Sequence, residues 1–145
     1  MSNFNVVSVN ISERRGIPKT PVDSIELKVG VGIYNDAHAG SGHREVSLLA
    51  LEDIQTMQAR NASVKIGDFA ENITTSGVVL HKLPIGTKLT IGDCLLEVTQ
   101  IGKECHSGCV IMKQVGECIM PKQGIFARVV KGGVITNGNT GTYSL

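Results

Sequence analysis

Glycine divides this chain into short runs that favour β-structure, and this division constrains the fold more than any other feature. The sequence contains 17 glycines, most of them between runs of apolar and β-branched residues, where turns with positive φ are needed. Residues 25–29 alternate apolar and polar side chains, which predicts a strand with one buried face. Gly92-Asp93 separates two further runs and predicts a hairpin turn. The strands expected are residues 4–11, 25–29, 88–91, 94–101, 125–130 and 133–136.

Residues 47–60 follow helical rather than strand periodicity. Apolar side chains recur at every third position from Leu48 to Met57, which places one apolar stripe on a helix, and Ser47 can cap the first turn. Residues 138–142 are expected to form a closing turn. Many short strands, glycine-rich turns and a single helix indicate an all-β barrel or sandwich.

The composition predicts one globular domain over residues 1–145 and argues against several kinds of partner. Hydrophobic residues make up 41% of the chain and charged residues 19%, as in a packed domain. An aromatic content of 3%, no tryptophan and a net charge of +1 without basic runs argue against nucleic acid or an anionic membrane. The N-terminal residues lack a signal-peptide pattern and no apolar run could span a bilayer, so we expect a cytoplasmic protein.

A cysteine-rich segment follows the strand expected at residues 94–101. Cys105, Cys109 and Cys118 lie within fourteen residues, and loops at strand ends are where a rigid scaffold displays reactive groups. A thiol is a nucleophile or sulfur carrier only as the thiolate, which needs a cationic or donor-rich setting. The nearby side chains that could supply this setting are Lys103, His106 and Lys113.

The same cysteines allow three other interpretations. They could be buried, inert thiols, because free cysteine is among the most buried residue types. With His106 they offer three thiolates and an imidazole, enough for a tetrahedral zinc site, although only one compact pair is present. A transient disulfide between Cys105 and Cys109 is the third interpretation. Cys94 differs from these, because it begins an alternating strand and is expected to pack in the core.

Two polar segments carry other candidate residues. Asp36, His38 and Arg44 lie in a glycine-rich loop, where Arg44 could bind a phosphate or carboxylate and His38 could donate a proton near neutral pH. A solvated loop is the alternative interpretation. The second segment is rich in hydrogen-bond donors and acceptors, and its residues of interest are Glu71, Asn72 and Thr74.

Arg128 is unusual because it lies inside an apolar strand. Such an arginine either pairs with a buried carboxylate or points into a polar site. Glu71 and Glu97 are the candidate partners if the arginine forms an ion pair.

These pieces occur in an order that resembles a known family. Gly-x-x-x-Asp-x-His over residues 32–38 comes first, followed by Arg44, Glu-Asn-Ile-Thr at 71–74 and Leu-Pro-Ile-Gly at 83–86. Ile-Gly-Asp at 91–93 precedes a strand, a cysteine follows that strand, and Gly-Ile-Phe-Ala-Arg-Val with a Gly-Gly pair ends the series. The ordered set covers nearly the whole chain and is similar to a stand-alone molybdenum-cofactor sulfurase C-terminal (MOSC) domain.

This resemblance implies both a fold and a chemistry. The fold would be mainly β, a closed or partly open barrel with Greek-key-like connections and one or a few short helices. Members act with the molybdenum cofactor, a pterin dithiolene that carries a phosphate, and the tungsten form is the alternative here. Cys105 matches the family cysteine and would carry a persulfide or ligate the metal, with Cys109 and Cys118 as further catalytic candidates. The residues implied to line the cofactor pocket are Asp36, His38, Arg44, Glu71, Asn72, Thr74 and Arg128.

Three functions are compatible with these features. In the first, the chain is a sulfur carrier or sulfurtransferase that accepts a sulfur atom on Cys105 and passes it to the cofactor. It contains no pyridoxal-phosphate lysine motif, so a cysteine desulfurase or another donor would supply the sulfur. In the second, the chain binds the cofactor through Arg44 and Arg128, during cofactor biosynthesis or for delivery to a molybdoenzyme. In the third, a zinc-stabilised β domain binds a protein partner.

Overall fold

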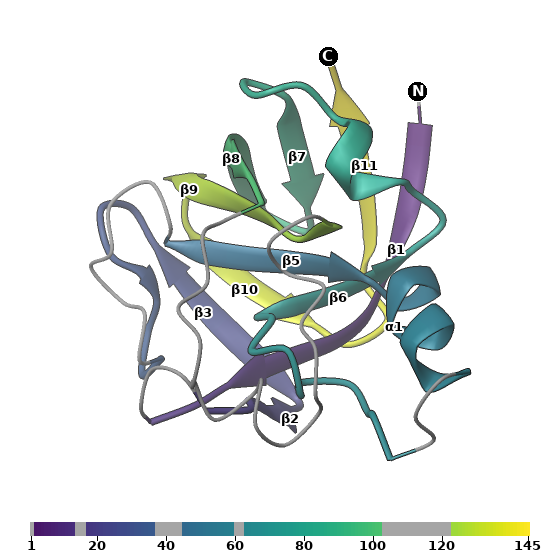
Figure 1. The fold of residues 1–145 in the computed structure, drawn as a ribbon. Coiled ribbons are helices and arrows are strands. Elements are labelled where there is room, and N and C mark those ends of the chain that lie inside the picture. Colours follow the sequence, from purple (N-terminus) through teal and green to yellow (C-terminus); the bar gives the residue numbers. More distant parts are fainter. Residues whose placement is uncertain (1, 14–16, 37–44, 60–62, 103–122) are drawn as a thin grey trace.

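In residues 2–13, 17–36, 45–59, 63–102 and 123–145, which the computed structural model describes, eight strands form one sheet and seven of these close into a barrel (Figure 1). The strands are β1 (Ser2–Ile11), β2 (Thr20–Val22), β3 (Ser24–Lys28), β4 (Gly32–Ile33), β5 (Val46–Ala50), β6 (Ile73–Ser76), β7 (Lys88–Ile91), β8 (Cys94–Ile101), β9 (Ile125–Lys131), β10 (Gly133–Thr136) and β11 (Thr140–Ser144). The helices are α1 (Leu51–Gln58) and the 3₁₀ turn η2 (Leu80–Lys82). The larger sheet has the order β11-β7-β8-β9-β5-β6-β1-β2, and a second sheet has the order β10-β3-β4.

The six strands expected from the sequence are all present, with bounds that agree within two residues. The hairpin at Gly92-Asp93 is confirmed, because Ile91 of β7 pairs directly with Cys94 of β8. The strands that sequence patterns did not indicate are β2, β4, β5, β6 and β11. The mainly β, barrel-type fold is therefore confirmed, and its closure depends on strands that were not predicted.

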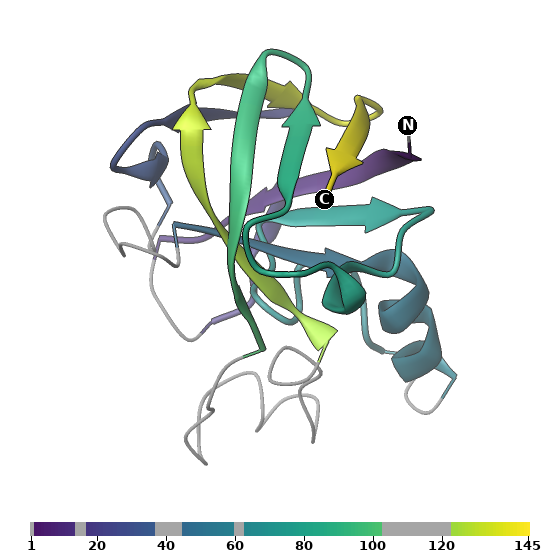
Figure 2. The same cartoon turned by 90° about the horizontal axis from the view of Figure 1, so that it is seen from above.

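The ring closes where β11 pairs with β1 on one side and with β7 on the other. The two ends of the chain consequently lie close together, as Figures 1 and 2 show. A turn over residues 138–142 was expected, and this expectation is wrong from Thr140 onward, where the strand begins. Gly141 carries no side chain at its inward position because the ring of Phe4 fills that space, where a Cβ atom would overlap it.

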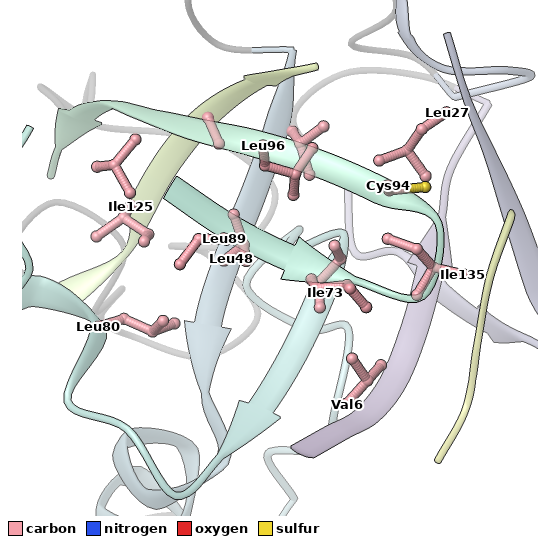
Figure 3. Packing of buried hydrophobic residues seen from close by; sticks show 14 of the residues in the cluster. Val6, Leu27, Leu48, Ile73, Leu80, Leu89, Cys94, Leu96, Ile125 and Ile135 are labelled. Atoms are coloured by element: carbon pink, nitrogen blue, oxygen red, sulfur yellow. The ribbon is translucent and has the colours of Figure 1, made fainter. Parts of the chain in front are cut away.

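The barrel interior is filled by aliphatic side chains from both sheets. Figure 3 shows Leu48, Ile73, Leu96 and Ile125 packed between the strands, with Leu80 of η2 covering one end. Cys94 belongs to the same cluster and exposes none of its surface. Burial raises the pKa of the Cys94 thiol, so the expectation that this cysteine packs in the core is confirmed.

The helix expected over residues 47–60 is only partly present. Residues Val46–Ala50 form β5, and the helix α1 begins at Leu51, without a side-chain cap. Every residue of β5 is buried, because the strand lies between β6 and β9 and has packed material on both faces. A strand buried on both faces is a continuous apolar run in the sequence. The position of Leu48 happens to match the spacing of the apolar residues in the helix that follows, so the strand residues were included in the predicted helix.

A second, smaller apolar cluster lies on the outer face of the barrel beneath α1. Ile54 and Met57 of the helix pack with Leu49 of β5 and Phe126 of β9 in this cluster, together with Phe69. It holds the segment before β6 against the barrel. Among the described residues, no helix has the length and apolar character needed to cross a membrane.

Candidate functional site

Three strand ends bring polar residues from distant parts of the sequence together. β5 and β6 run parallel, with Leu48 opposite Ile73, and β1 runs antiparallel to β6, with Val9 opposite Ile73. The N-terminal ends of β5 and β6 and the C-terminal end of β1 therefore meet at one place on the barrel. Two of the sequence-predicted residues, Asn72 and Thr74, lie at this meeting point.

Asn72 connects all three strands. Its Oδ1 accepts hydrogen bonds from the backbone N–H of Ser47 at 3.0 Å and from the Ser47 hydroxyl at 3.1 Å, and its Nδ2 donates to the carbonyl of Asn10 at 3.2 Å. Its own backbone N–H donates to the Ser47 carbonyl at 3.0 Å. Asn72 is fully buried, and buried polar groups stabilise a fold only when they are hydrogen-bonded. Its side chain is therefore a structural connector in this conformation.

Thr74, Glu71 and Asn10 extend the network. The Thr74 hydroxyl donates to Glu71 Oε2 at 2.9 Å, and Asn10 Nδ2 donates to the Glu71 carbonyl at 3.0 Å and to Thr74 Oγ1 at 3.2 Å. The backbone N–H of Gly67 donates to Glu71 Oε2 at 3.1 Å. The carboxyl group thus fixes the turn that leads into β6.

The carboxyl group of Glu71 is chemically unusual. It is fully buried, and burial raises its pKa to about 7, although hydrogen bonds from Gly67, Thr74 and nearby backbone oppose the shift. Its Oε1 atom has no hydrogen-bond partner within the described part of the chain. A carboxyl group with this pKa exchanges its proton near neutral pH, as groups at functional sites often do.

Asp36, from the first motif, lies in an ion pair beside this network. Its Oδ1 is 2.8 Å from Lys19 Nζ and accepts the backbone N–H of Ser12 at 3.1 Å, and both charged side chains are fully buried. The backbone N–H of Lys19 donates to the carbonyl of Gly67 at 2.7 Å. Gly67 therefore joins the Asp36–Lys19 pair to Glu71, and the first and second motifs form one connected unit.

A cavity of about 360 Å³ opens beside this unit. Its wall includes Ser12, which bonds to Asp36, and Asn35, which precedes Asp36 in the chain. It also includes Pro18 and Thr20, which flank Lys19 in the chain. Its volume is within the usual range for small-molecule sites. The cavity is therefore a candidate space for a ligand of the first motif.

Arg128 is placed apart from the network. Its Nε donates to Glu97 Oε1 at 2.6 Å, while Lys88 Nζ is 2.7 Å from Glu97 Oε2. Hydrogen bonds from Lys88 and Arg128 lower the pKa of Glu97. Of the two partners suggested by the sequence, the structure selects Glu97, and the pair lies on the surface. The Arg128 side chain is 50% exposed, and its terminal nitrogens have no partner in the described residues, so they are able to bind an anion.

The remaining candidates fall outside the described residues: His38, Arg44, Cys105, Cys109 and Cys118. The structure does describe the points from which the cysteine segment starts and ends. Ile101 pairs with Ile125, and the N–H of Gly102 donates to the Gly124 carbonyl at 2.7 Å. Within the described ranges, no group of three or more His, Cys, Asp and Glu side chains is arranged to hold a metal. The zinc interpretation and the metal-ligand role of Cys105 remain predictions.

Sequence reasoning missed several residues that build the network, namely Asn10, Ser12, Lys19 and Gly67. Asn10 lies in an expected strand, where an asparagine is unfavourable unless its amide is hydrogen-bonded, and this was a weak indication. Ser47 was expected to cap a helix and instead bonds to Asn72. The pairing of Lys19 with Asp36 depends on tertiary structure alone.

The chain belongs to the MOSC-domain family: the family model for the MOSC domain matches residues 35–141. The matched region begins next to Asp36 and includes the second motif, the cysteine segment and Arg128. A search among curated proteins found no match.

Solved structures with the same fold cover almost the whole chain. The YuaD protein from Bacillus subtilis is 15% identical, with a TM-score of 0.82, over 99% of this chain and 97% of that one. YiiM from Geobacillus stearothermophilus is 22% identical, with a TM-score of 0.76, over 98% of this chain and 75% of that one. YiiM from Escherichia coli is 16% identical, with a TM-score of 0.69, over 100% and 70%. These likenesses establish the fold.

Proposed function

We propose that this protein is a sulfur carrier that accepts a sulfur atom on Cys105 and transfers it to a molybdenum or tungsten pterin cofactor. Membership of the MOSC family supports the cofactor, and the three cysteines of the segment after β8 support the sulfur chemistry. The cofactor is the acceptor of the sulfur in this proposal and is treated as a substrate. A cysteine desulfurase, or another donor of sulfane sulfur, completes the system.

The observation that carries the proposal is the anchoring of the cysteine segment. Residues 103–122 connect β8 and β9, which pair along their length as far as Ile101 and Ile125.

 The residues that flank the segment are therefore held by the β8–β9 pair of the barrel, with the Gly102 N–H bonded to the Gly124 carbonyl at 2.7 Å. A reactive loop on a rigid scaffold meets its partners at a defined place.

The sulfur transfer is an ordinary thiolate exchange. The Cys105 thiolate attacks the terminal sulfur of a donor persulfide, R–S–SH, the S–S bond of the donor breaks, and the donor leaves as the thiolate R–S⁻. Cys105 then carries the sulfur as Cys–S–SH until a second thiolate cleaves this S–S bond. Cys109 and Cys118 are the candidates for this second thiol because they are close to Cys105 in sequence. Attack on the Cys105 sulfur forms a disulfide and releases hydrosulfide, HS⁻, which is the form of sulfur delivered to the cofactor, and a dithiol reductant then restores the two thiols.

The other residues of the family motifs would bind and position the cofactor. Arg128 has N–H groups available for an anionic group such as the pterin phosphate, and Arg44 would add a second guanidinium. The buried unit around Asp36, Asn72 and Glu71 holds the backbone of both motifs in place. The hydrogen bonds of its polar side chains are mostly made within the unit itself, so these side chains would position the loops of the two motifs.

The test is the intact mass of anaerobically purified protein before and after treatment with a cysteine desulfurase and cysteine. The expected result is the gain of one sulfur atom, removed by reductant, mapped to residues 103–122 and absent in Cys105→Ser. Cys94→Ala is the matched control, because Cys94 is buried and should not take part. If Cys105→Ser gains and transfers sulfur at the normal rate, the proposal is wrong.

A second candidate function, cofactor binding without sulfur chemistry, is favoured by the half-exposed Arg128. It requires tight binding of the cofactor that depends on Arg128 and Arg44 and is unaffected by Cys105→Ser. Lys88→Ala is a suitable control for Arg128→Ala, because Lys88 contacts the same carboxylate, Glu97. Undiminished affinity in Arg128→Ala and Arg44→Ala would exclude this function.

A further inference from the structure

A second and larger cavity, of about 590 Å³, lies away from the polar network. It is formed where β5 and β6 end, whereas Ser47 and Asn72 lie where these strands begin. Its floor is apolar, with Ala50, Val78 and Leu83 buried, and the half-buried Tyr143 of β11 adds an aromatic side chain. The volume suits a small organic molecule, and an apolar floor with few polar groups is typical of such sites.

One carboxylate in the wall of this cavity, that of Asp53, is mostly buried and has only a long-range ion-pair partner among the described residues. The side chain of Asp53 is 17% exposed, and no donor in the described residues forms a hydrogen bond to it. His81 Nδ1 lies 4.0 Å from Asp53 Oδ2, close enough for an ion pair when the imidazole is protonated but too far for a hydrogen bond. His81 Nδ1 is itself buried and has no hydrogen-bond partner within the described ranges.

The charge around the cavity is compatible with a cation. Burial raises the pKa of Asp53, with His81 opposing and Glu52 adding to the shift, so a bound cation would restore favourable surroundings to the carboxylate. Glu52 also lines the cavity. Its Oε2 accepts a hydrogen bond from the backbone N–H of Gly77 at 2.8 Å, which holds α1 against the segment after β6 in the cavity wall. Lys82 is the positive side chain in the described lining, and it is exposed to solvent.

We propose that this cavity binds a small organic amine or amidine, with its cationic group on Asp53 and its apolar body on the floor formed by Ala50, Val78 and Leu83. An ammonium or amidinium group supplies the N–H donors that Asp53 lacks, and its hydrogen bond to a carboxylate is of the stronger, charge-assisted kind. The site goes beyond the proposed sulfur chemistry and needs no residue of the cysteine segment.

The test is ligand-observed NMR titration of the full chain with benzamidine and benzylamine as cations and with benzyl alcohol as a neutral compound of similar size. Both cations should bind about tenfold more tightly than benzyl alcohol. Asp53→Asn should remove this preference, while Lys82→Gln, the matched control on the same wall, should keep or increase it. Val79→Arg places a cation at an exposed position of the lining and should also weaken the binding of both cations.

Three results would overturn the inference: cations and alcohol binding equally, unchanged cation affinity in Asp53→Asn, or no binding to the wild type up to roughly 10 mM. Thermal melting establishes that each variant is folded, and Val79→Arg gives an independent result if Asp53→Asn is not. Cys105→Ser should bind benzamidine as the wild type does. The proposal of the amine site and the proposal of the sulfur-carrier function can therefore be refuted independently of each other.

Discussion

Replacing Glu71 with glutamine should change how the stability of the protein depends on pH. The pKa of this buried carboxyl rises from 4.5 to about 7 on folding. Because the folded protein holds the proton more tightly than the unfolded chain, the group stabilises the fold fully below about pH 4.5, and this contribution is lost as the pH rises through about 7. The difference between these two pKa values, 4.5 and about 7, corresponds to about 3 kcal/mol of unfolding free energy.

Glutamine resembles the protonated carboxyl in shape and hydrogen bonding, and it does not ionise. Its oxygen can accept the hydrogen bonds that Gly67 and Thr74 now donate to Glu71. Between about pH 5 and about pH 9, the wild type should lose about 2–3 kcal/mol more of its free energy of unfolding than Glu71→Gln does. The variant should therefore be the more stable protein at the alkaline end of this range.

Urea unfolding of both proteins across this pH range measures the difference directly. Glu26→Gln serves as the matched control, because it removes one carboxyl from an exposed position on β3 and reports the effect of net charge. If the difference in unfolding free energy between wild type and Glu71→Gln is constant from about pH 5 to about pH 9, this explanation of the role of Glu71 is refuted.

Three further single substitutions, and one double variant, test the network by urea or thermal unfolding. Asn72→Ala leaves the buried N–H of Ser47 without an acceptor and should cost about 2–3 kcal/mol; a loss below about 0.5 kcal/mol would show that the network contributes little. Gly67→Ala should destabilise by at least about 2 kcal/mol, since Gly67 has φ +91° and its added Cβ would lie 2.0 Å from the Lys19 carbonyl oxygen; a stability equal to wild type would contradict this contact. Lys19→Met leaves the buried Asp36 carboxylate without its ammonium and should cost about 3–5 kcal/mol, part of which Asp36→Asn should restore in the double variant; no restoration would argue against the ion pair.

The strands with one buried face were predictable from the sequence, and the strands buried on both faces were not. In β3, Ile25 and Leu27 are buried while their neighbours are exposed, so the alternation is visible in the residue types. In β5 all five residues are buried. Successive side chains face the barrel interior and the space beneath α1 in turn, and because both places are buried, the sequence shows no matching alternation of apolar and polar residues. A neighbouring helix then makes the apolar run look helical.

The candidate site was predictable only as separate motifs. Asp36, Glu71, Asn72 and Thr74 were identified from their residue types and order, but the contacts that unite them come from Asn10, Ser12, Lys19 and Gly67, which carry no motif. Lys19 and Asp36 are 17 residues apart, and Asn10 and Asn72 are 62 apart. Contacts between residues so far apart depend on strand register, which local patterns do not determine.

The pairing of β1 with β11 has a consequence for how this protein is made. Ser2 pairs with Tyr143, so β1, which can pair with β2 and β6 earlier in synthesis, gains its partner β11 only when nearly all of the described chain has been made. Until then the nascent sheet has two open edges, and unpaired edges invite pairing with other chains. Contacts this distant in sequence slow folding. The protein is therefore expected to depend on molecular chaperones more during synthesis than after its barrel has closed.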